Sequence, residues 1–268
     1  MFRKDSNFYS RVDKKMEGHW KILFFCIFII NIVSIVVDKG SFSLEIIEFL
    51  KEVIYSGFSI DKFSKIIIEE HSFDFVHILI SLATNLFTIT LNMVLLDFIR
   101  TGKFEIKNIL NYVKEYPIQT VGASIIFYLL HVIFGYIPII GAIINYILHF
   151  GFSYVYYLIL INPKENPINL FLKSWKLTDG NKMELFHKVI HYFKIAWYGY
   201  GISAVGFLIV LFATYKSHQM NFIGGFGIFT IIFGFAWLIF WKIKNTPHYY
   251  LACALYFKEH MEYKNIKV

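Results

Sequence analysis

The sequence predicts an all-α membrane protein, a polytopic bundle of six transmembrane helices with amphipathic helices at both membrane interfaces. The first indication is composition: 57% of the 268 residues are hydrophobic and only 17% are charged, whereas soluble domains usually carry about 25% charged residues. The second is a series of long uncharged segments, and the third is the uneven distribution of lysine and arginine between them. The longest connection, 38–74, is too short for a separate ATPase, kinase or hydrolase domain, so residues 1–268 are predicted to form a single integral membrane domain.

Each predicted span is an apolar segment close to the roughly 20 residues that an α-helix needs to cross a bilayer. Pro117 and Pro138 suit the first turns of their helices, where no intrahelical hydrogen bond is lost. A basic N-terminal segment before an apolar stretch is also typical of a signal peptide, but no small-x-small cleavage site follows Val37, which favours an uncleaved helix. The six predicted spans cover about residues 20–37, 75–96, 117–134, 138–161, 195–215 and 222–241.

Three connecting segments are predicted to contain amphipathic helices. Segment 38–74 is predicted to be an extracellular amphipathic loop, because its apolar residues recur at helical spacing. A second apolar stripe comprises Ile106, Ile109, Leu110 and Val113. A third helix should begin at Asn166-Pro167 and stop at Gly180, with its apolar face formed by Ile168, Phe171, Leu172 and Trp175. A mixed helical tail should follow from Pro247.

The basic residues predict the orientation. The N-terminus, the second and fourth connections and the C-terminus hold 21 of the 26 lysines and arginines, so the positive-inside rule places both termini in the cytoplasm of a multi-pass cell-membrane protein. The net charge of +7 then reflects this topology, and no nucleic-acid partner is expected. Cys26 and Cys253 are expected to be free thiols.

Polar residues on two spans form the candidate ligand-binding groove. His77, Ser81, Asn85, Thr88 and Asn92 recur at spacings that place them on one stripe of the second span, and Asn145, His149 and Ser153 do so on the fourth. Because polar side chains avoid lipid, both stripes should face the bundle interior and one another. The alternative is that these residues only form hydrogen bonds between helices.

Other motifs predict neither catalysis nor a cofactor. His187 and His191 have a spacing that can bind a metal, but no glutamate follows His187 as it would in a metalloprotease helix, and we predict no metal site. The segment 224–227 is glycine-rich but lacks the lysine of a phosphate-binding loop. Small residues instead suit close helix packing: Gly199, Ser203 and Gly206, and Gly227 with Gly234.

Three segments resemble a family of uncharacterised integral membrane proteins of Gram-positive bacteria, defined as a domain of unknown function. They are Lys14 to Phe24 with Gly18-x-Trp20, Ser174-Trp175 followed by Asp179 to Lys182 and Leu185-Phe186, and Pro247 to Tyr256. His248 departs from the pattern, since the family has a Pro-Tyr pair there. The resemblance implies a multi-span membrane fold and brings no catalytic residues.

These observations favour a non-enzymatic membrane protein that binds or passes a small or lipidic ligand, as a transporter, scramblase or protective membrane factor. The alternative is an accessory subunit of a larger membrane complex. An intramembrane enzyme is less favoured, because the predicted spans contain no Asp or Glu and leave only His77, His131 and His149 for acid–base chemistry. The expected partners are membrane lipids, with either a homo-oligomer or a larger membrane complex.

Overall fold

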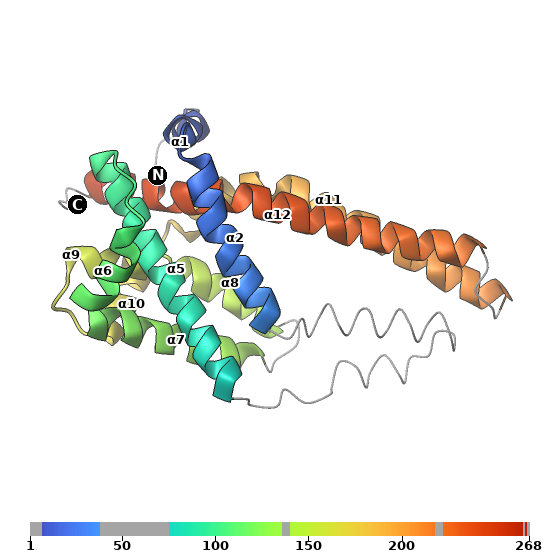
Figure 1. The fold of residues 1–268 in the computed structure, drawn as a ribbon, viewed down its shortest axis with the longest axis horizontal. Helices are drawn as coiled ribbons and strands as arrows, with labels where there is room; N and C mark the ends of the chain where they lie inside the picture. The colour runs from blue at the N-terminus through green and yellow to red at the C-terminus, as the bar shows by residue number, and fades with distance from the viewer. Residues whose placement is uncertain (1–6, 38–74, 136–139, 218–221, 265, 267–268) are drawn as a thin grey trace. The chain divides into compact units, whose positions relative to one another are not determined.

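The computed structural model of the protein describes residues 7–37, 75–135, 140–217, 222–264 and 266, and its regular elements there are all α-helices (Figure 1). This confirms the predicted all-α class. The helices are α1 (Phe8–Met16), α2 (Trp20–Val37), α5 (Phe75–Thr101), α6 (Lys107–Glu115), α7 (Pro117–Gly135), α8 (Ile140–Phe152), α9 (Val155–Ile161), α10 (Pro167–Thr178), α11 (Lys182–Ser217) and α12 (Phe222–Tyr263).

Four helices among the described residues are long and apolar enough to cross a membrane, which confirms the prediction of transmembrane helices. Their apolar stretches are Ile78–Thr101, Pro117–Phe134, Ile190–Ala213 and Ile223–Tyr263. They overlap the predicted spans 75–96, 117–134, 195–215 and 222–241. The predicted span 20–37 coincides with α2, and the predicted loop 38–74 lies outside the described residues.

The segment predicted as one span over 138–161 is two helices, α8 and α9, interrupted at Ser153-Tyr154. The predicted second span also ends later than expected, since α5 continues past Asp97 to Thr101. The Asp97 carboxylate accepts a hydrogen bond from the Tyr112 hydroxyl of α6 and lies 3.6 Å from the Arg100 guanidinium. These contacts satisfy a charged group that would otherwise terminate the apolar helix.

The chain divides into two compact units. Unit 1 comprises the described parts of 1–30, 79–192 and 246–268, and unit 2 those of 31–78 and 193–245. Helices α11 and α12 contribute residues to both units, and each unit is described below by itself.

The core of unit 1 is built around the C-terminal half of α12. All residues from Leu251 to Phe257 are buried, as are those from Ile89 to Leu96 of α5 and from Val155 to Ile159 of α9. The helix runs without interruption through Pro247, so the segment predicted as a tail is a core element. A proline inside a helix costs about 3 kcal/mol, and the burial of the following residues offsets this cost.

Helices α6 and α10 each bury one face in unit 1, and each buried face includes only part of the predicted apolar face: Ile109 in α6 and Phe171 in α10. In α10, Asn166 caps the helix by accepting a hydrogen bond from the Ile168 amide at 2.9 Å, as predicted. Ser174 and Thr178 face inward, and Ile168 and Leu172 are 62% and 58% exposed. In α6, Ile109 of the predicted stripe is buried with Tyr112, whereas Ile106 and Leu110 are exposed.

The N-terminal helix α1 packs on unit 1 through Phe8, Val12 and Met16, which are buried one turn apart. The guanidinium of Arg11 lies 2.8 Å from the Glu259 carboxylate of α12. A buried apolar face flanked by an ion pair is the arrangement expected of an amphipathic helix that packs against a protein core.

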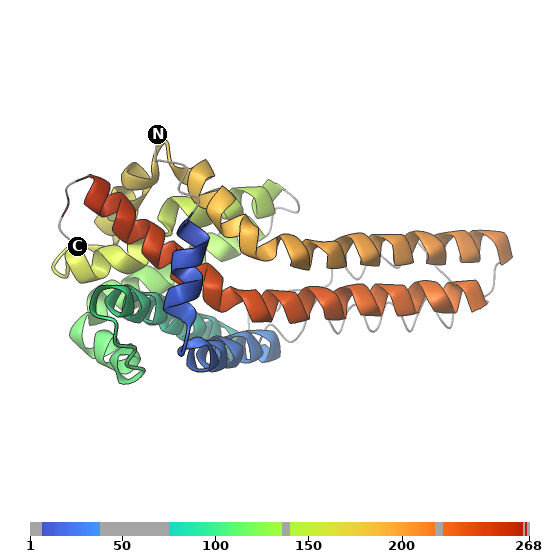
Figure 2. The ribbon, with the colours of Figure 1, turned by 90° about the horizontal axis from the view of Figure 1, so that it is seen from above.

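Unit 2 contains a hairpin of α11 and α12, which lie side by side (Figure 2). A Cβ atom added at Gly206 would lie 2.7 Å from the Gly227 carbonyl oxygen, and one added at Gly199 would lie 2.5 Å from that of Gly234. The two backbones are therefore in direct contact. The predicted role of these glycines in close helix packing is confirmed.

Candidate functional site

The polar stripe of α5 divides into two halves that differ in their hydrogen bonding. The C-terminal half contains Thr88 and Asn92, and Asn92 is almost fully buried. The Asn92 amide donates to the Thr88 carbonyl at 2.8 Å, and its oxygen accepts from the Tyr157 hydroxyl of α9 at 3.1 Å. Thr88 donates to the carbonyl of Thr84 at 2.9 Å. This half holds helices together, as the alternative prediction required.

The N-terminal half of the stripe contains polar groups that lack such contacts. The side chains of Ser81 and Asn85 are half-buried, and no hydrogen bond joins either of them to another described residue. The hydroxyl of Thr84 is buried and likewise has no hydrogen-bond partner within the described part of the chain. The side chain of His77 is not among those described. Three adjacent polar groups in a membrane-length helix thus lack partners among the described residues, and the half-buried side chains of Ser81 and Asn85 are the two that solvent can reach.

The shorter stripe on α8 is tied to α12. His149 Nε2 lies 2.5 Å from the Tyr249 hydroxyl, and the Ser153 hydroxyl donates to the Phe150 carbonyl at 2.9 Å. Asn145 is half-buried. Within the described residues no hydrogen bond joins this stripe to that of α5, so the shared groove of the two stripes stays a prediction.

A second tyrosine–histidine pair was missed by the sequence reading. The Tyr154 hydroxyl lies 2.7 Å from Nδ1 of His260, and Asn181 Nδ2 lies 3.4 Å from Nε2 of the same ring. If Asn181 donates to Nε2, the ring proton is on Nδ1 and is donated to the tyrosine oxygen, which specifies a neutral imidazole. The sequence contains no local signal for this pair, because Tyr154 and His260 lie 106 residues apart in the chain.

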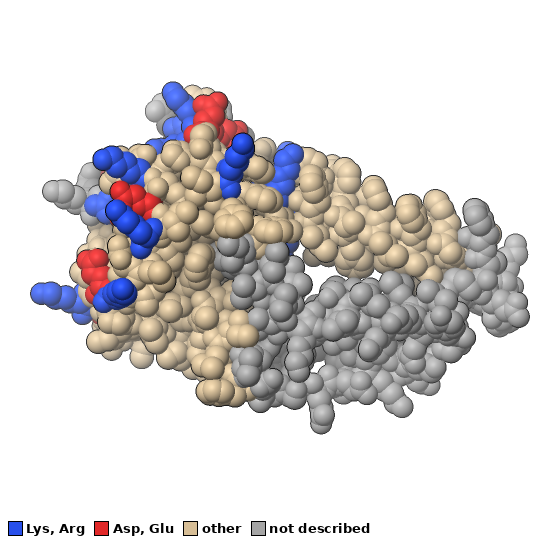
Figure 3. Space-filling model, viewed as in Figure 1, with Lys and Arg blue, Asp and Glu red and all other residues tan. Residues whose placement is uncertain are grey.

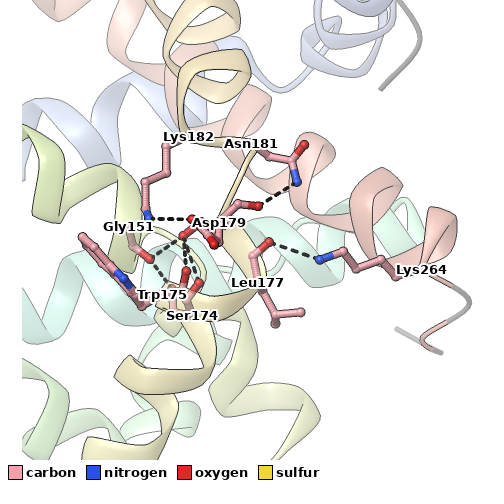
Figure 4. A network of polar contacts seen from close by, with 9 residues as sticks. Gly151, Ser174, Trp175, Leu177, Asp179, Asn181, Lys182 and Lys264 are labelled. Carbon is pink, nitrogen blue, oxygen red and sulfur yellow. Dashed lines mark hydrogen bonds and ion pairs between the residues drawn. The ribbon is translucent and has the colours of Figure 1, made fainter. Parts of the chain in front are cut away.

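The interruption between α8 and α9 explains how these tyrosines are placed. Ser174 of α10 donates to the Gly151 carbonyl at 2.8 Å and accepts from the Tyr154 amide at 3.2 Å. Thr178 also donates to the Gly151 carbonyl, at 3.1 Å. The hydroxyls of α10 therefore satisfy backbone groups exposed by the interruption. Figure 4 shows Ser174 next to Gly151 in this network.

The Trp175 ring closes this network. A Cβ atom at Gly151 would lie 2.4 Å from the Trp175 ring, so only glycine allows the ring to pack this close to the backbone. The ammonium of Lys182 lies 3.7 Å from the centroid of the same ring. Gly180, with φ of 75°, allows the chain to reverse between α10 and α11. The segment 174–182 thus anchors the α8–α9 interruption.

The histidine pair of α11 is placed in an aromatic cluster. His191 stacks on Tyr9 of α1 with ring centroids 4.0 Å apart, and His187 is exposed. Across the described residues no three His, Cys, Asp or Glu side chains form a group that could hold a metal ion.

The arrangement offers hydrogen-bonding groups and no assembled nucleophile–base pair among the residues named above. The unsatisfied groups of Ser81, Thr84 and Asn85 can bind hydroxyl, amide or phosphate oxygens of a ligand. The tyrosine–histidine pairs of unit 1 are engaged with one another. No protein-family model matches the chain, and neither a curated protein nor a solved structure is significantly similar to it.

Proposed function

We propose that the chain is a six-span, non-enzymatic protein of the cell membrane that binds or passes a small or lipidic ligand along the N-terminal half of α5. The four membrane-length helices supply four of the spans. Helix α2 and the α8–α9 pair would supply the other two, with both termini in the cytoplasm according to the positive-inside rule. The resemblance to uncharacterised membrane proteins of Gram-positive bacteria agrees with this topology.

The observation that carries the proposal is the set of unsatisfied polar groups on α5. Within the described residues, Ser81, Thr84 and Asn85 have no hydrogen-bond partners, although they lie in a helix suited to a membrane. The buried hydroxyl of Thr84, which has no partner among the described residues, costs about 1–3 kcal/mol, and the half-buried groups of Ser81 and Asn85 cost less. A bound molecule with oxygen or nitrogen groups would remove this cost.

The exposed side of α7 supports the second candidate, an accessory subunit. Its exposed large hydrophobic residues form an apolar stripe at helical spacing: Ile118, Val121, Ile125, Leu129 and Ile133. Either lipid or another membrane protein would cover such a stripe.

Two measurements test the proposal. The first is labelling by a small aqueous thiol reagent in a background that lacks Cys26 and Cys253. We expect Ser81→Cys and Asn85→Cys to be labelled and Asn92→Cys to be protected, because only Asn92 is fully buried. Protection of all three positions, with normal labelling of an exposed loop cysteine, would contradict a ligand-accessible stripe.

The second measurement is native mass spectrometry of the protein purified in mild detergent. We expect a retained small molecule or lipid that is lost in Ser81→Ala/Asn85→Leu. The control is Thr230→Val in α12, whose hydroxyl bonds only to the Phe226 carbonyl of its own helix at 2.9 Å. A stable complex with another membrane protein and no retained ligand would favour the accessory subunit instead.

A further inference from the structure

The first turn of α7 is held against the connection between α9 and α10. Gln119 Nε2 of α7 donates to the Glu165 carbonyl at 3.3 Å. A Cβ atom at Gly122 would lie 2.6 Å from Cγ of Pro167, so the proline ring packs directly against the α7 backbone at Gly122. These contacts bring residues 162–168 beside the point where α6 ends and α7 begins.

Apolar side chains are exposed at this junction. Ile118 and Ile168 are 71% and 62% exposed. The apolar stretch of α7 begins at Pro117, and that of α8–α9 ends at Ile161, so two apolar segments have their ends together here. A junction of this kind belongs at the level of the lipid headgroups. Beside it, Asn162, Pro163, Lys164 and Glu165 line a shallow depression of about 320 Å³.

Two lysines flank the junction with their charges unneutralised. Lys114 and Lys164 are exposed, and neither forms an ion pair with another residue in the described part of the chain. On the face drawn in Figure 3, the charged side chains of unit 1 gather over α1, α6 and the α9–α10 connection. Helix α7 itself contains no charged residue.

The nearby carboxylates are already engaged. Glu115 accepts a hydrogen bond from the Tyr116 hydroxyl at 2.6 Å, and burial together with this carboxylate raises the pKa of Tyr116 to about 12, so it stays a neutral donor at physiological pH. Glu165 pairs with Lys173 and accepts from Asn169 at 2.9 Å. Glu115 keeps its negative charge, because Tyr116 is neutral, whereas Glu165 is paired with Lys173. Three lysines against two carboxylates still leave the junction with a net positive charge next to exposed aliphatic side chains.

We propose that this junction is a binding site for the headgroup of an anionic phospholipid. We call it the α7 start site and define it by Lys114, Ile118, Lys164 and Ile168. The two ammonium groups would pair with phosphate oxygens, and the isoleucines would contact the first methylenes of the acyl chains. This site is separate from the α5 stripe and does not depend on the ligand proposed there.

An anionic phospholipid is favoured over a soluble phosphate because the lysines stand next to apolar side chains at the end of a membrane-length helix. A soluble phosphate would gain nothing from Ile118 and Ile168. A protein–protein interface has a buried core that is poor in charged residues, and lysine is depleted in such interfaces. The two lysines at this junction therefore argue against a protein partner.

The test is native mass spectrometry of the full chain titrated with phosphatidylglycerol or phosphatidylcholine in mild detergent. We expect tighter retention of phosphatidylglycerol, weakened about fivefold for each lysine removed and about 25-fold in Lys114→Gln/Lys164→Gln. The matched control is Lys14→Gln/Lys21→Gln, which removes two other exposed lysines and should leave retention within about twofold. Equal helical circular dichroism would verify that both variants are folded.

Three results would overturn the proposal. Equal weakening in the two double variants would show attraction to net charge rather than a site. Displacement of phosphatidylglycerol by millimolar inorganic phosphate would assign the site to a soluble anion. Loss of a co-purifying protein in Lys114→Gln/Lys164→Gln, without a change in lipid retention, would assign it to a protein. None of these results bears on cysteine labelling of α5, so the two proposals fail independently.

Discussion

The two units of this protein pack their helices by different means. In unit 1, buried side chains are joined by specific hydrogen bonds between tyrosines and polar partners, as in Tyr154 with His260 and Tyr157 with Asn92. In unit 2, the α11–α12 hairpin brings backbones together at Gly199, Gly206, Gly227 and Gly234. The same two helices contribute to both units, so local sequence rather than helix identity decides how the packing is achieved.

This difference predicts different sensitivities to substitution. In unit 2 the critical quantity is side-chain volume, because one added carbon meets backbone atoms that cannot move aside. In unit 1 the critical quantity is hydrogen-bond satisfaction, because a lost partner leaves a polar atom buried. Substitutions that change only volume or only hydrogen bonding separate the two.

The largest effect is expected from alanine at the hairpin contacts. A Cβ at Gly206 would lie 2.7 Å from both the Gly227 carbonyl oxygen and the Ile231 amide nitrogen. Gly206→Ala should therefore lower the free energy of unfolding by about 2–3 kcal/mol, as overpacking does. Unfolding in mixed SDS micelles, followed by tryptophan fluorescence, measures this difference.

The control lies in the same helix. Nothing lies within 4 Å of a Cβ added at Gly201, so Gly201→Ala should be neutral or stabilise the helix by up to about 1 kcal/mol. Equal destabilisation by the two substitutions would show that backbone contact does not determine the stability of the hairpin.

The second effect concerns the buried polar pair of unit 1. Tyr154→Phe preserves the ring that packs at 4.8 Å on Phe257 but removes the hydroxyl that contacts His260. A buried imidazole nitrogen would lose its partner, at a cost of about 1–2 kcal/mol in the same unfolding measurement. Tyr198→Phe, at a position 67% exposed, should change the free energy by less than about 0.5 kcal/mol. Similar effects of the two substitutions would contradict a stabilising role for the pair.

The features that the sequence predicted correctly depend on short stretches of chain. The helical class and four membrane-length helices follow from runs of apolar residues, and the close contact at Gly206 and Gly227 follows from small residues at helical spacing. The Asn166-Pro167 helix start was equally local. Such signals need no knowledge of distant partners.

The features that the sequence reading missed depend on residues far apart. The predicted span over 138–161 is interrupted because Ser174 of α10 offers hydrogen bonds to Gly151 and Tyr154. The same contacts turn Ser174 and Thr178 inward, and Ile168 and Leu172, predicted to belong to the apolar face of this helix, are exposed. For the candidate site, the stripe of α5 could be listed from its spacing. The division of this stripe into a half with hydrogen-bond partners and a half without them could not be predicted, because Tyr157 lies 65 residues away from Asn92 in the sequence.

A smaller effect is expected where a hydrogen bond lies within a membrane-length helix. A double-mutant cycle with Asn92→Ala and Tyr157→Phe measures the coupling between the amide oxygen and the hydroxyl, which are 3.1 Å from one another in α5 and α9. Such couplings in membrane proteins average about 0.6 kcal/mol. A coupling near zero would mean that apolar packing, rather than this hydrogen bond, stabilises unit 1. The proposed difference between hydrogen bonding in unit 1 and backbone contact in unit 2 would then be weaker.

The smallest effect is expected at the surface of unit 1, where hydrogen bonds from Lys173 and Asn169 hold the pKa of Glu165 below its usual value of 4.5. Because the folded pKa is lowered, the stabilisation is present above about pH 4.5 and is lost as the pH falls through the folded pKa. Lys173→Gln should therefore lower the melting temperature slightly at pH 7, and this difference should disappear as the pH falls through the folded pKa of Glu165. Lys176→Gln, at another exposed position of α10, should show no such pH-dependent difference. A difference in melting temperature that does not change with pH would mean that Lys173 stabilises the protein through packing. Hydrogen bonds would then contribute to the stability of unit 1 only in its buried interior.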